Sequence, residues 1–331
     1  MRTSIAVSLT VLLLGACGAP SESARPRDVG TLGERNSAVP TVAPTVAPID
    51  LGDIDDDAEE IDPAVASGFL VWTRDADGRT LTSRLDRTGR EVQRLDGIFI
   101  ATTQGSWRWG EQVRSVTTYR CERYDDEGAM VQAIDAQPGA ATRAALVLEK
   151  TSTEQVIVEP PADGDGAYDF QQSVELVGSV GRYLFVRRST YVDACGAHGI
   201  TSMWSMIWDT ARGSEVVLPD DMPFVAGARA DALRALTQDE DGFPASEGTM
   251  ALSEIVPRFD TDGALRPVLQ FTAPTCYACT RGGGGSYTKS AFLPASALPE
   301  LLAPYERAPH AVRTFLAAHR GIELGGWSAL P

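Results

Sequence analysis

The side chains best suited to acid–base chemistry lie in one turn-like segment between two apolar runs. His198 is flanked by small residues, and Asp193 and Tyr191 stand shortly before it. Histidine titrates near neutral pH, so His198 and Asp193 could form a polar centre with Tyr191 or with Tyr277 from a later loop. The alternative is that His198 braces its own turn by hydrogen bonding to the turn's carbonyl groups. Neither a Gly-x-Ser-x-Gly elbow nor a His-Glu-x-x-His motif is present to extend this centre.

Four cysteines that follow the N-terminal one could form disulfides or hold a metal. Cys276 and Cys279 have the spacing of thiol oxidoreductases, but the glycines Gly282–Gly285 follow them, so no helix can begin there to lower the pKa of a thiol. We expect two disulfides, Cys276 with Cys279 and Cys121 with Cys195, although three pairings are possible in principle. A four-cysteine zinc site is the alternative. We expect no metal and no other cofactor.

The first cysteine, Cys17, ends a segment typical of a bacterial lipoprotein signal. Arg2 precedes an apolar run from Ile5 to Leu14, and two small residues stand directly before the cysteine. Because the run is about half the ~20 residues that a spanning helix needs, residues 1–16 are predicted to be a cleaved signal peptide. Acyl chains such as palmitate on Cys17 would then anchor the chain in a membrane. We expect a cell-envelope lipoprotein, in the outer membrane if the host has one; a plain secretory signal is the alternative.

The composition of the chain agrees with export and predicts a flexible tether. Asp and Glu total 45 against 29 Lys and Arg, and the net charge of -16 repels phosphates, so nucleic acid is not expected as a partner. Residues 17–63 are rich in Pro, Ala and acidic residues and have too little apolar surface to bury on folding. We therefore predict that this segment holds the folded part away from the membrane.

The elements that would position the polar residues begin near residue 64. Short apolar runs alternate with turn signals at roughly ten-residue spacing up to residue 150, a pattern that predicts an antiparallel meander. Residues 182–192 and 200–208 predict central strands of a sheet, with Trp204 and Trp208 as core residues. No period of about 40 residues continues through the chain, so a propeller is the less favoured alternative.

Helices are predicted only late in the chain, at residues 228–236, 297–302 and from Pro309 to Gly321. Strands followed by segregated helices predict an α+β fold, in which an antiparallel β-rich meander precedes a mixed sheet with late helices. The predicted divisions are the meander at residues 64–150 and the α+β region at residues 151–331. These two regions could form one domain.

One stretch has a recognisable family pattern, made of Tyr191, the Gly-Ala-His-Gly turn at Gly196–Gly199, Trp208–Thr210 and Val217–Asp220. It resembles the domain of unknown function at the C-terminal end of RsiV-type anti-sigma factors and in some peptidoglycan deacetylases. The resemblance covers about residues 141–305, and Cys195 and the insertion Cys276–Gly285 depart from the family's pattern. It implies an α+β envelope module that engages a protein or glycan partner.

Two hypotheses of different classes follow from these patterns. The favoured one is a lipid-anchored envelope protein that is a non-enzymatic binding or interaction module, with an envelope protein or glycan as its partner. The alternative is a hydrolase or other enzyme that acts on an envelope polymer through Asp193 and His198. The missing catalytic motifs favour the binding module.

Overall fold

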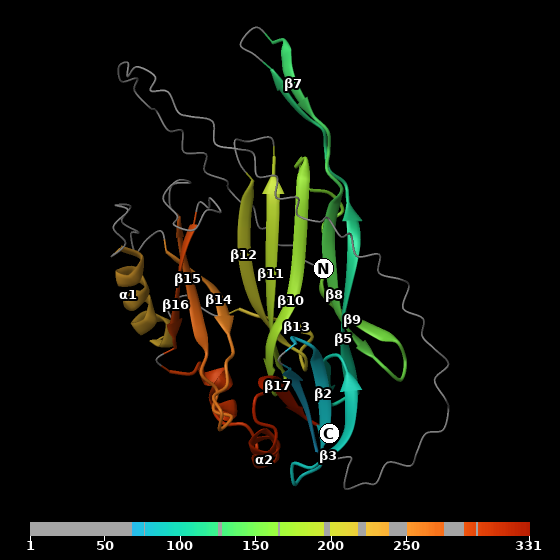
Figure 1. The fold of residues 1–331 in the computed structure, drawn as a ribbon, viewed down its shortest axis with the longest axis vertical. Coiled ribbons are helices and arrows are strands. Elements are labelled where there is room, and N and C mark those ends of the chain that lie inside the picture. The colour runs from blue at the N-terminus through green and yellow to red at the C-terminus, as the bar shows by residue number, and fades with distance from the viewer. Residues whose placement is uncertain are drawn as a thin grey trace, which may run out of the picture. The chain divides into compact units, whose positions relative to one another are not determined.

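The structure is a computed structural model, and it describes residues 68–75, 77–124, 128–164, 166–194, 199–217, 223–237, 250–274, 288–295 and 297–331 (Figure 1). Residues from Asp57 onward belong to one compact unit. The predicted signal peptide and tether lie outside the described residues. No described helix is both long and apolar enough to cross a membrane.

Strands dominate the described part of the chain. The large sheet is built from β1 (Phe69–Arg74), β2 (Thr80–Leu85), β3 (Glu91–Asp96), β4 (Phe99–Thr102), β5 (Gly105–Val116), β8 (Gly139–Leu148), β9 (Thr153–Val158), β10 (Asp169–Val180), β11 (Tyr183–Asp193), β12 (Ile200–Asp209), β13 (Ser214–Val216) and β17 (Glu323–Ala329). A second sheet contains β14 (Ala251–Val256), β15 (Val268–Pro274) and β16 (Thr288–Pro294), and β6 (Cys121–Tyr124) pairs with β7 (Met130–Ile134). The helical elements are α1 (Pro223–Thr237), the 3₁₀ helix η3 (Glu300–Tyr305) and α2 (His310–Ala318).

The large sheet divides at β10. Its main path runs β13-β12-β11-β10-β17-β1-β2-β3, and β8 also pairs with β10 and carries β5 and β9. Both β17 and β8 run parallel to β10, at different points along its length. β4 returns to β17, where the Ala101 amide donates a hydrogen bond to Ser328 Oγ at 2.8 Å. The sheet therefore curls over one of its own faces.

Each face of the large sheet covers its own hydrophobic core. The curled side encloses Trp72, Trp107, Trp109 and Leu184. The opposite face packs against the second sheet and the helices, in a core that contains Phe185 and elements as distant as β15 and α2. Because β1 is covered on both faces, successive residues in its middle are all buried instead of alternating with solvent-exposed ones.

Two glycines let β17 enter the middle of this sheet. Any side chain at Gly325 would overlap the ring of Trp72, and any side chain at Gly326 would overlap Ser179 on β10. The Trp72 indole N–H donates a hydrogen bond to Ser179 Oγ at 2.8 Å across the same gap. The absence of side chains therefore brings β1, β17 and β10 together.

The predicted α+β fold is wrong, because the chain forms a β-rich fold with a large mixed sheet. Helices do form at the predicted segments, but 228–236 is part of α1 and 297–302 becomes the short 3₁₀ helix η3, which contains Pro304. The chain does not end in helices. After α2, which ends before Gly321 as predicted, it returns as β17 and pairs with the first strand, β1.

The meander prediction is confirmed for β1, β2 and β3, which pair antiparallel in sequence order. β4 leaves the meander and pairs with β5 instead. The two predicted central strands are β11 and β12, which pair with each other along their lengths. β11 is central as expected, but among the described residues only the short β13 lies on the outer side of β12.

Candidate functional site

Asp193 and Tyr191 lie near the end of β11, on the same face of the strand because they are two residues apart. Asp193 is buried, and its Oδ2 accepts a hydrogen bond from the Tyr168 hydroxyl at 3.1 Å. Its other oxygen, Oδ1, is also buried and accepts no hydrogen bond from any described residue. Partial desolvation, followed by the hydrogen bond to Asp193, raises the pKa of Tyr168.

Tyr191 packs on the glycine directly before β12. Its ring occupies the space that a side chain at position 199 would need, so this position requires Gly199. The turn that precedes Gly199 contains His198, which lies outside the described residues. The structure places Tyr191 and Asp193 near the end of β11, and their pairing with His198 stays a prediction.

The cysteine predictions fall largely outside the described residues, where Cys17, Cys195, Cys276 and Cys279 lie together with Tyr277. Cys121 is described. It is buried and disulfide-bonded. A disulfide-bonded cysteine has no thiolate to offer to zinc, so Cys121 cannot join a four-cysteine site in this form. The described residues contain no group of His, Cys, Asp and Glu placed to hold a metal ion.

The sequence patterns did not predict that the outer side of β12 lacks a paired strand along most of its length among the described residues. β13 pairs with Ile207, Trp208 and Asp209 only, and no other described strand pairs with the outer side of β12 from Ile200 to Met206. We call this stretch the open edge. Trp204 was predicted to be a core residue but is 38% exposed, and Ile200 and Met203 are 56% and 40% exposed.

Among the described residues, the open edge lacks two common protections against pairing with another chain, namely charged side chains and proline. Proteins commonly protect sheet edges with charged side chains, proline or bulges. Charged residues do occur on the outer strands β3, which contains Glu91 and Arg94, and β9, which contains Glu154, and on β5 beyond its pairing with β4, where Glu111 and Arg114 lie. The open edge has no charged residue, no proline and no glycine.

A small cavity of about 200 Å³ lies at the inner end of the open edge, between β12, β13 and β14. Trp204, Ser205, Glu215 and Leu252 contribute to its lining. Burial raises the pKa of Glu215, opposed by the charge of Arg188. The Ile255 amide donates a hydrogen bond to Ser205 Oγ at 3.3 Å, which marks where β14 closes against β12. A strand added to the open edge would therefore end beside this cavity.

Arg187 fixes the second sheet against the large one next to this cavity. Its guanidinium donates two hydrogen bonds to Glu254 on β14, at 2.6 and 3.0 Å, and one to Glu175 on β10 at 3.0 Å. Glu254 is only 2% exposed, so nearly all of its interactions are within the protein. The packing of β14 against β11, behind the open edge, is therefore stabilised by charge-assisted hydrogen bonds, which are stronger than neutral ones.

Comparisons with known proteins give structural neighbours only. No protein-family model matches the chain, and no curated protein matches it. A member of the DUF3298 family from Bacteroides fragilis is similar at 12% identity and a TM-score of 0.31, covering 64% of this chain and 98% of that one. A DUF3298 family protein from Pseudomonas aeruginosa is similar at 11% identity and a TM-score of 0.27, covering 61% and 96%. The structural neighbours are DUF3298 proteins, a domain of unknown function.

Proposed function

We propose that this chain is a lipid-anchored protein of the bacterial envelope whose folded part binds another protein. The anchor is Cys17 at the end of the lipoprotein signal, and residues 17–63 are the tether. The partner contributes an extended segment that pairs with the open edge of β12, in the manner of strand addition. The predicted resemblance to envelope modules of RsiV-type anti-sigma factors agrees with such a role.

The observation that carries this proposal is the uncharged stretch from Ile200 to Met206, which pairs with no described strand on its outer side and whose first five residues are exposed. An open edge presents amide and carbonyl groups that a further strand can satisfy. Backbone pairing would provide the affinity, and the cavity at the inner end of the edge would accept one side chain and provide selectivity. This arrangement suits a polypeptide.

A protein fits this surface better than a glycan or a second copy of the chain. Glycan platforms need an accessible aromatic face, whereas the guanidinium of Arg188 lies over the Trp204 ring, 4.8 Å from its centroid. A peptide that also fills the cavity gains burial that two identical edges would lack.

The experiment compares recovery of partners by the full lipidated chain and by two lysine variants. Met203→Lys places a charge on the open edge, and Val113→Lys places one on the outer side of β5, where charged residues already occur. We expect a defined envelope protein to be recovered by the parent chain and by Val113→Lys, and to be lost with Met203→Lys. Equal recovery by all three would refute strand addition at β12.

The anchor is tested separately with Cys17→Ser. We expect this change to abolish labelling by radioactive fatty acid and to leave the protein unprocessed or released from membranes. Labelling that persists in the variant would refute the lipoprotein assignment. Partner recovery in solubilised extracts should survive this change, because the binding surface lies in β12.

One observation supports testing the enzymatic alternative: the buried Oδ1 of Asp193 accepts no hydrogen bond from any described residue. If a hydrolytic centre uses Asp193 and His198, Asp193→Asn and His198→Asn should each abolish release of products from cell-wall polymer without unfolding the chain. If His198 only braces its turn, neither variant changes product release, and His198→Asn costs about 1 kcal/mol of stability.

A further inference from the structure

Two neighbouring cavities lie where the chain leaves the end of β14 and passes Phe259. The larger, of about 700 Å³, lies at the end of α2 and along the start of β17, and the smaller, of about 320 Å³, lies between β1, β10, β11 and the segment after β14. They share Phe259, Glu323 and Leu324. Both volumes are within the range of small-molecule sites, roughly 300–1,000 Å³.

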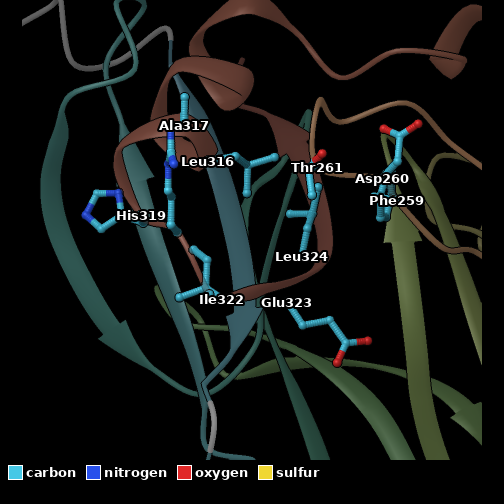
Figure 2. Close-up of a pocket in the computed structure, with 11 residues that line it drawn as sticks. Phe259, Asp260, Thr261, Leu316, Ala317, His319, Ile322, Glu323 and Leu324 are labelled. Atoms are coloured by element: carbon cyan, nitrogen blue, oxygen red, sulfur yellow. The ribbon is translucent and has the colours of Figure 1, made fainter.

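The larger cavity has an apolar centre with polar groups around it. Figure 2 shows the apolar side chains of Leu316, Ile322 and Leu324 between His319 on one side and the carboxylates of Asp260 and Glu323 on the other. The His319 ring is held in place, because its Nδ1 is 2.9 Å from the Phe315 carbonyl and the ring stacks against Phe315. This cavity suits an apolar side chain.

The charged side chains that line the smaller cavity fall into two sets, those that already form ion pairs and those that form none. Arg74 and Arg187 are already used, because both donate to Glu175, and Arg74 also reaches the Leu176 carbonyl at 3.3 Å. Glu323 lies opposite Arg74 in the β1–β17 pair but receives no bond from it. Among the described residues, Glu323 and Arg258 form no ion pair with each other or with any other side chain, although both line this cavity.

We infer that the two cavities bind a zwitterion, namely an apolar amino acid or short peptide with a free amino group and a free carboxyl group. Arg258 would receive the carboxylate through the paired donors of its guanidinium, and Glu323 would receive the ammonium group. The apolar side chain of the ligand would enter the larger cavity, against Phe259 and Leu324, which both cavities share. Both Arg258 and Glu323 are exposed, so water solvates them in the free protein, and a zwitterion is the ligand that forms an ion pair with each of them.

The inferred site is tested by calorimetry on the full chain held in lipid nanodiscs. The probes are leucyl-leucine, its N-acetyl form and its C-terminal amide. We expect leucyl-leucine to bind, and each blocked form to bind up to about fivefold more weakly, the loss expected when one ion pair to an exposed group is removed.

Variants assign the two ends of the ligand. With Arg258→Gln, leucyl-leucine and its amide should bind equally, while the preference for the free amino group remains. With Glu323→Gln, leucyl-leucine and its N-acetyl form should bind equally, while the preference for the free carboxyl group remains. Arg79→Gln, a change of an exposed arginine paired with Asp96, should alter nothing.

Three outcomes would overturn the inference: no heat of binding at millimolar peptide, equal binding of the free and blocked forms by the parent chain, or loss of both preferences in either variant. The result is independent of the proposed partner site, since Met203→Lys should leave peptide binding unchanged. A chain that binds the peptide but recovers no partner protein would contradict only the proposal for β12.

Discussion

Arg187 shows how a single side chain joins the two sheets. It bonds to Glu254, which is almost fully buried, so removing the arginine leaves a carboxylate without compensation. We expect Arg187→Met to lower the free energy of unfolding by about 3–5 kcal/mol, measured by urea denaturation. The double variant Arg187→Met with Glu254→Leu should recover most of the loss, because no buried charge then remains. A loss well under 1 kcal/mol in the single variant would contradict this account.

Tyr168 and Asp193 provide a test by titration. The pKa of Tyr168 is raised above its ordinary value near 10, first by desolvation and then by Asp193, so the stabilisation from its neutral hydroxyl is present below about pH 10 and is lost as pH rises through the folded pKa. We expect Asp193→Asn to lower that pKa without restoring its ordinary value. Ultraviolet absorbance of tyrosinate measures it, with Tyr168→Phe to identify the step. If the pKa of Tyr168 measured in Asp193→Asn equals that in the parent chain, Asp193 does not affect the titration of Tyr168.

At the scale of elements, the open edge should make the free protein prone to association. Met203→Lys should reduce light scattering by concentrated protein, because a charge on an exposed edge disfavours pairing with another strand. The free energy of unfolding should change by no more than about 0.5 kcal/mol, as for other exposed sites. Val113→Lys should leave the scattering unchanged. Equal scattering by all three proteins would indicate that the open edge does not drive association.

The same strand shows what sequence patterns can and cannot predict. Alternation correctly places Trp204, Met206 and Trp208 on one face of β12, since it depends only on the geometry of a strand. It does not say whether another strand lies alongside. Met206 is buried where β12 is covered, and Trp204 is exposed where the open edge begins, because β13 pairs with only the last few residues. The site could be predicted as a strand but not as an edge.

At the scale of the whole molecule, the fold depends on pairing between the two ends of the described chain. β17 lies between β1 and β10, and neither partner is near it in sequence. Local helix signals at α1 and α2 were correct, yet they predicted the wrong fold class because nothing in a local pattern shows that the chain returns to the sheet after α2. Local sequence patterns thus predict strands and turns, but they do not predict the order in which distant strands pair.

A substitution at a glycine of β17 tests the close approach of β17 to β1. Gly325→Ala should lower the free energy of unfolding by about 1–3 kcal/mol, because the new methyl group overlaps the ring of Trp72. Gly110→Ala on β5 is the matched control, since a methyl group there would make only ordinary contacts at 3.8 Å. Chemical denaturation measures both. A Gly325→Ala protein as stable as the control would contradict the close approach of β17 and β1.

The most direct test of the central proposal is photo-crosslinking from the open edge in intact cells. A photoreactive residue is placed at Ser202 on β12 and, as a control, at Val113 on β5. We expect Ser202 to crosslink to one continuous segment of a single envelope protein, and Val113 to give no crosslink to that segment. Crosslinks to the same protein from Val113 but not from Ser202, or none from Ser202 at all, would contradict the proposal that β12 accepts a partner strand.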